Sequence, residues 1–175
     1  FDVGDPNETD PPTVVAALAN DTARGGTTNT DLVTSDPAIA GVITDENPVA
    51  IVRASIDETG IAFFADITDT LDVSGALSLD PDRINAIAGG ILADGVHTVR
   101  IVADDVFGNQ SAPFELTFTL DTIAPAISFV ISPAFDSDPL GDDRTQEEIV
   151  DFNGTTEADI PLTVSDVGDL TSDAA

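Results

Sequence analysis

The chain has 175 residues, of which 33 are acidic and five are arginine, so its formal net charge is −28. This charge excludes the basic surface that nucleic acid binding needs, and it disfavours anionic membranes. Self-repulsion at this density opposes compact folding, so bound divalent cations or high salt are expected to screen it.

The composition allows a packed core but no disulfides. Hydrophobic residues make up 42% of the chain, cysteine is absent, and Phe is its sole aromatic type. A secreted domain without disulfides often uses bound metal instead. No apolar run approaches the roughly 20 residues that span a bilayer, so no membrane insertion is expected. The chain begins at Phe1, and we expect it to be an internal or processed piece of a longer protein.

Alternating apolar and polar residues, bounded by Gly, Pro, Asn and Asp, predict β-strands along most of the first 121 residues. The expected strands cover residues 13–18, 37–43, 49–57, 61–66, 74–79, 99–103 and 114–121. One helical segment is expected from Pro81 to Ala88, because Asp80 can cap it and proline suits the first helical position. Short strands with turn signals over about 110 residues predict an all-β, antiparallel sandwich.

An internal repeat is indicated by an offset that needs no gaps. Pro125 aligns with Pro12, an offset of 113 residues (125 − 12), and Phe114 then aligns with Phe1. The same offset pairs further apolar and glycine positions: Val14 with Ile127, Leu18 with Ile131, Ile39 with Phe152, Gly41 with Gly154, Val49 with Leu162 and Ile51 with Val164. A fixed period of this kind is typical of tandem repeats.

The repeat predicts a division of the chain into three parts. Residues 1–11 are the tail of a preceding repeat and a linker, residues 12–122 form a complete repeat, and residues 123–175 form the first part of a second one. This second repeat lacks the strands corresponding to residues 61–120. A half-sandwich would expose its core, so we expect the missing strands to come from continuation of the chain or, alternatively, from another chain.

Several segments together resemble bacterial Ig-like domains of the Big type. Residues 92–99, continuing into 103–111, are similar to that family's penultimate strand and loop, and residues 121–125 (DTIAP) to its junction between domains. Residues 136–145 resemble its acidic first loop, and residues 154–158 resemble a strand ending. The resemblance implies Ig-like β-sandwich repeats in tandem, as in secreted bacterial adhesins, biofilm proteins and surface filaments.

In such arrays calcium often stiffens the chain, so the resemblance implies Ca²⁺ as the cofactor. It implies neighbouring repeats, and other copies of the chain in a filament, as partners. Calcium takes 6–8 oxygen ligands from carboxylates, carbonyls and water. The segment from Asp136 to Asp151 is rich in acids, and Gly141 lets the loop turn back, so a calcium loop is expected there with Asp136, Asp138, Asp142 and Asp143 as ligands, although no full EF-hand spacing is present. The alternative is a solvated acidic loop without a metal.

A second group of candidate ligands is expected at the end of the sandwich where the chain enters. It comprises Asp104, Asp105 and Asn109 in the last loop, Asp45 and Glu46 in a turn, and Asp10 in the linker. The equivalent second junction would draw on Asp121, Glu157 and Asp159. Alternatively, Asp104 and Asn109 cap a tight turn in which Gly108 supplies a positive φ.

Catalysis is not expected. His97 is the chain's one histidine and lies in a predicted strand, cysteine is absent, and no nucleophile-elbow motif occurs. Two other functions stay open. One is a carbohydrate- or other ligand-binding sandwich, although the Trp and Tyr residues that stack on sugars are absent. The other is a surface-layer component of a halophile, in which the acids serve salt adaptation.

Overall fold

The computed structural model describes residues 9–22, 30–124, 126–134 and 152–155. It divides into two compact units, residues 1–123 and 124–175, with a boundary one residue beyond the one expected from the sequence. The first unit contains β1 (Thr13–Leu18), β2 (Val33–Thr34), β3 (Ile39–Thr44), β4 (Val49–Ile56), η1 (Ile61–Phe63), β5 (Ala65–Asp66), η2 (Thr68–Thr70), β6 (Ala76–Leu79), α1 (Pro81–Ala88), β7 (Gly95–Asp105) and β8 (Phe114–Leu120). The second unit contains β9 (Ser128–Ile131) and β10 (Phe152–Thr155).

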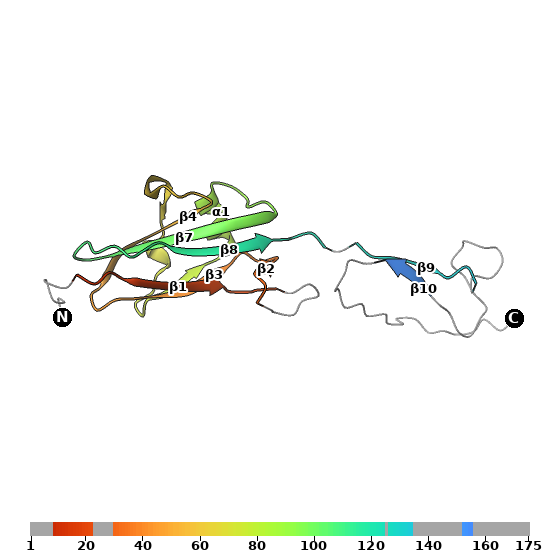
Figure 1. Ribbon diagram of the computed structural model, residues 1–175, viewed down its shortest axis with the longest axis horizontal. Coiled ribbons are helices and arrows are strands. Elements are labelled where there is room, and N and C mark those ends of the chain that lie inside the picture. Colours follow the sequence, from red (N-terminus) through yellow and green to blue (C-terminus); the bar gives the residue numbers. More distant parts are fainter. Residues whose placement is uncertain (1–8, 23–29, 125, 135–151, 156–175) are drawn as a thin grey trace. The chain divides into compact units, whose positions relative to one another are not determined.

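The first unit is a sandwich of two sheets, which Figure 1 shows as two facing layers. One sheet has the strand order β1-β3-β6, and the other has the order β2-β8-β7-β4-β5. All pairs are antiparallel except β2 with β8. Apolar side chains from both sheets meet in one core, among them Ile39, Leu79, Val52, Ile101 and Phe118. The expected all-β sandwich is therefore confirmed.

Strand β8 shows why the apolar alternation works as a signal. Leu116, Phe118 and Leu120 point into the core and are buried, whereas the alternating residues Glu115 and Thr117 are exposed. Successive side chains of a strand point to opposite faces, so one face of β8 packs on the core and the other meets solvent.

The helix is also as expected. The Asp80 carboxylate accepts a hydrogen bond from the Arg83 backbone N–H at 2.7 Å, and Pro81 is at the first helical position. The helix ends at Gly89, whose φ of 79° is the left-handed conformation common at helix C-termini. Ile84 buries its side chain and fastens the helix to the core.

The strand expected over residues 61–66 is largely wrong. Residues Ile61–Phe63 form a 3₁₀ turn, and only Ala65–Asp66 pairs with β4. Ile61 and Phe63 are exposed, so no core contact holds them in an extended conformation. After them the Asp66 carboxylate accepts hydrogen bonds from the N–H and hydroxyl of Thr68, which turns the chain.

The second unit pairs its strands in the same register as the first. In β1 and β3, Leu18 lies opposite Ile39 and Ala16 lies opposite Gly41. In β9 and β10, Ile131 lies opposite Phe152 and Phe129 lies opposite Gly154. Adding 113 to each residue number of the first pairing gives the second. The offset found in the sequence therefore relates two equivalent strand pairs.

The described residues also bear on membrane insertion. No helix among them has the length and apolar character needed to cross a bilayer.

Candidate functional site

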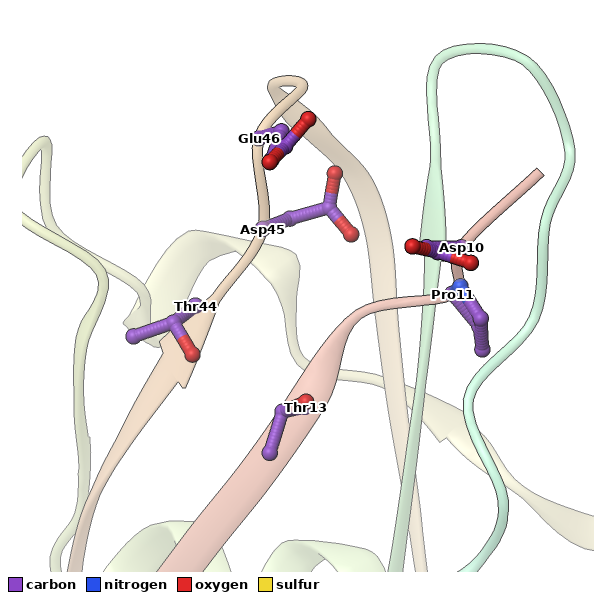
Figure 2. A pocket seen from close by; sticks show the side chains of 6 residues that line it. All are labelled: Asp10, Pro11, Thr13, Thr44, Asp45 and Glu46. Atoms are coloured by element: carbon purple, nitrogen blue, oxygen red, sulfur yellow. The ribbon is translucent and has the colours of Figure 1, made fainter. Parts of the chain in front are cut away.

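Carboxylates from two segments gather where the chain enters the first unit. Asp10 precedes β1, and Asp45 and Glu46 form the turn between β3 and β4. The register of β1 with β3 places Thr13 opposite Thr44, which brings the two segments side by side. Together these residues line an open pocket, and Figure 2 shows Asp45 and Asp10 facing each other across it.

The loop between β7 and β8 lies at this same end. Val49 pairs with Asp105 in the β4–β7 ladder, and the Val106 N–H donates to the Pro48 carbonyl at 3.1 Å. The expected meeting of this loop with the Asp45–Glu46 turn is therefore confirmed.

The Asp105 side chain closes the tight turn after β7. One carboxylate oxygen accepts the backbone N–H groups of Phe107 and Asn109, each at 2.8 Å, and the other accepts the Asn109 side-chain amide at 2.8 Å. Gly108 adopts a φ of 89° in this turn. Burial raises the pKa of Asp105, but the hydrogen bonds from Asn109 and Phe107 outweigh it and hold that pKa below its ordinary value.

Asp104 points the opposite way from Asp105, because adjacent strand residues alternate between faces. Its carboxylate pairs with the Arg53 guanidinium and accepts a hydrogen bond from the Gln110 amide at 2.8 Å. The turn-capping alternative is thus realised, with Asp105 rather than Asp104 as the capping carboxylate. Asp104 and Asp105 do not converge on one point.

Other predicted ligands lie elsewhere in the chain. Asp121 follows β8 at the exit end of the first unit, where its N–H donates to the Thr34 carbonyl and its carboxylate accepts the Ile123 N–H. Within the described part of the chain, no group of three or more His, Asp or Glu side chains is arranged to hold a metal ion. Six candidates lie outside the described residues: Asp136, Asp138, Asp142, Asp143, Glu157 and Asp159.

Each arginine among the described residues is engaged by an acidic side chain. Arg53 pairs with Asp104, Arg83 with Asp69, and Arg100 with Glu115. These pairs leave most of the chain's negative charge to be screened by something other than its own arginines.

Sequence reasoning missed a polar network at the exit end. The Asp94 carboxylate accepts both the N–H of Thr122, at 3.0 Å, and its hydroxyl, at 2.8 Å. His97 lies in β7, as expected of a strand residue, and its ring contacts Asp57 and the Ala93 carbonyl. Asp57 and His97 are 40 residues apart, so no local motif could indicate their contact.

No family model matches the chain, and no curated protein matches it. Among solved structures, the chain is similar to the crystal structure of dimeric latent PorU from Porphyromonas gingivalis, with 18% sequence identity and a TM-score of 0.49. The match covers 75% of this chain and 13% of that chain. A likeness at this level carries no argument about function, and the sandwich assignment rests on the strands described above.

Proposed function

We propose that this chain is a structural repeat unit of a secreted, calcium-rigidified cell-surface adhesin or extracellular filament. Its role is adhesion or spacing, without catalysis. The observation that carries the proposal is the shared register of β1–β3 and β9–β10 at an offset of 113 residues. Two equivalent strand pairs along one chain support an array of like units, in which length and stiffness are the useful properties.

The resemblance to bacterial Ig-like domains of the Big type supports the same proposal. Such repeats stand between others of their kind, so neighbouring repeats of the same chain, and further copies in a filament, are the proposed partners. The described hydrogen bonds at Thr122 and Asp121 fix the start of the linker to the first unit. A linker anchored in this way suits an extended stalk better than a flexible tether does.

The proposed cation site is the pocket lined by Asp10, Asp45 and Glu46, whose three carboxylates do not by themselves form a metal-binding group. Calcium needs more oxygen ligands than three carboxylates supply, so water and the preceding repeat would complete the shell. Bringing these acids together without a cation costs electrostatic energy in a chain of net charge −28. A bound cation would remove that repulsion at the entry end of the first unit, where a preceding repeat would join it.

The test is thermal unfolding in millimolar calcium, in excess chelator, and in molar potassium chloride with chelator. A calcium-dependent rise in melting temperature that potassium chloride does not reproduce supports the proposal. Equal recovery in potassium chloride would instead support salt adaptation as the reason for the acidity. A melting temperature unchanged across all three conditions contradicts the calcium part of the proposal and leaves the repeat architecture standing.

A further inference from the structure

The ring of His97 lies between two hydrogen-bond acceptors. Its Nδ1 is 2.8 Å from a carboxylate oxygen of Asp57, and its Nε2 is 2.7 Å from the Ala93 carbonyl oxygen. Neither partner has a proton to donate when Asp57 is ionised. A neutral imidazole has one N–H and can satisfy one acceptor, whereas an imidazolium donates to both. The geometry therefore fits the protonated ring.

The ring is partly enclosed, although the residues of both acceptors, Asp57 and Ala93, are exposed. The His97 side chain is 12% exposed, and its ring centroid lies 6.1 Å from that of Phe118 on β8. Neutral His97 would leave one ring nitrogen without a proton facing an acceptor oxygen. Such a pair of facing acceptors is repulsive, so loss of the proton should separate at least one of them.

The two acceptors belong to segments that the ring holds together. Asp57 follows β4 and has a φ of 60°, which is uncommon for a residue other than glycine. Its other carboxylate oxygen accepts the Thr98 N–H at 2.8 Å, so the carboxylate joins the turn after β4 to the start of β7. Ala93 lies in the segment that leads from α1 into β7.

Ala93 is bonded to the residue that anchors the exit of the first unit. The next residue is Asp94, whose carboxylate accepts both the N–H and the hydroxyl of Thr122. The peptide between Ala93 and Asp94 is thus held by His97 at one end and presents the Thr122 anchor at the other. Movement of this peptide would move the anchor.

The charged groups around His97 come from three elements. Asp57, directly after β4, is the charged side chain that contacts the ring. Asp94 precedes β7 and directs its carboxylate at Thr122. Arg100 lies three residues further along β7, on the opposite face, where Glu115 of β8 engages it. Facing the ring, β8 contributes the uncharged Phe118.

We propose that protonated His97 is a pH-sensitive latch that fixes the exit of the first unit by holding the Ala93–Asp94 peptide against Thr122. The latch is closed while the ring carries its proton and loosens when the proton is lost. Burial lowers the pKa of His97, but the hydrogen bonds to Asp57 and Ala93 and the Asp57 charge raise it by more, so the pKa lies above its ordinary 6.5.

The sign of the stability effect follows from this direction. A pKa raised by folding stabilises the folded chain fully below pH 6.5, and the stabilisation is lost as pH rises through the folded-state pKa. The composition isolates the effect, because the chain has no Cys and no Tyr and its sequence contains no Lys. Above the carboxylate range, His97 is the one side chain that titrates before arginine.

The primary test is an NMR titration of the His97 ring in two folded chains, the parent and the Asp57→Asn variant. We expect a midpoint above 6.5 in the parent chain and a lower one in Asp57→Asn. The free energy of unfolding should fall between pH 6 and pH 9 in the parent chain and should vary less in His97→Gln. Both chains carry the same terminal amine, so the difference between them cancels its contribution. The pKa shift from the NMR titration must account for the pH dependence of the unfolding free energy, since each pKa unit corresponds to about a tenfold change in the folding constant.

The latch itself is tested by hydrogen exchange at the Thr122 amide, corrected for intrinsic rates. We expect protection to drop through the His97 midpoint in the parent chain and to be low at every pH in Asp94→Ala. A ring midpoint at or below 6.5 would overturn the proposal, even if His97→Gln failed to fold. Exchange protection of the Thr122 amide that stays constant through the His97 titration would also overturn the proposal.

Discussion

Gly41 lies so close to Val15 across the β1–β3 pair that a Cβ at residue 41 would be 2.6 Å from the Val15 carbonyl oxygen. Gly154 has the same relationship to Ser128, where the corresponding distance is 2.5 Å. These are equivalent positions at the 113-residue offset. A glycine is therefore required at both positions, because the backbone of the paired strand approaches too closely for a Cβ atom.

This close approach predicts that Gly41→Ala destabilises the first unit. The added methyl must displace the β1 backbone, and overpacking of this kind costs about 1–3 kcal/mol. Urea unfolding measures the change in the free energy of unfolding. Gly90→Ala is the matched control, since a Cβ there meets nothing within 4 Å. Equal stability of the two variants would contradict the close approach.

The elements that sequence predicted well are those whose own residues carry the signal. Strand β8 alternates over its whole length, and α1 has both its cap and its proline. The two-residue strand β2 was missed, because nothing in Val33–Thr34 shows that it pairs in parallel with the far end of β8. The strand expected at residues 61–66 is wrong for the opposite reason. The apolar run indicates a strand, but Ile61–Phe63 has no neighbouring strand to pair with among the described residues.

The candidate site divides in the same way. Asp45, Asp10 and the turn after β7 were placed at one end because sandwich topology brings alternate loops together. The partners of individual carboxylates could not be predicted. Whether Asp104 meets a metal or Arg53 depends on which strand neighbours it, and Arg53 is 51 residues away in the chain.

The buried Asp105 carboxylate predicts a stability change at acidic pH. Its pKa is lowered by folding, so its stabilisation is present above its unfolded pKa and is lost as pH falls through the folded value. In Asp105→Asn an amide group would face the Asn109 amide, two donors together, so the variant should be less stable than the parent near neutral pH.

Chemical unfolding from pH 7 down to pH 3 measures this effect. The gap between the parent chain and Asp105→Asn should narrow as pH falls, since the parent then loses what the variant already lacks. Comparing the two chains at each pH cancels the general relief of repulsion among the other carboxylates. A gap that stays constant would show that the Asp105 charge does not stabilise the turn.

The cap of α1 gives a third prediction. Asp80→Ala removes the acceptor for the Arg83 N–H, and loss of an N-cap costs about 0.5–2 kcal/mol. Asp82→Ala is the control, because Asp82 is in the first turn and exposed but does not cap the helix. Its loss should cost only the few tenths of a kcal/mol of a surface charge near a helix N-terminus. A larger loss in the control would contradict the capping role of Asp80.

The entry-end pocket gives the last prediction, which separates a specific cation site from general charge screening. Glu46 lines the pocket, whereas Glu58, which is also exposed, lies after β4 and outside the pocket. Glu46→Gln and Glu58→Gln each remove one negative charge with almost no change in shape.

In chelator, both variants should melt at or slightly above the parent temperature, because each relieves some repulsion. In millimolar calcium, Glu46→Gln should gain less stability than the parent, whereas Glu58→Gln should gain as much. Isothermal titration with calcium checks the same point, with weaker binding expected for Glu46→Gln alone. If both variants respond to calcium as the parent does, the cation acts as a diffuse counterion and Glu46 is not its ligand.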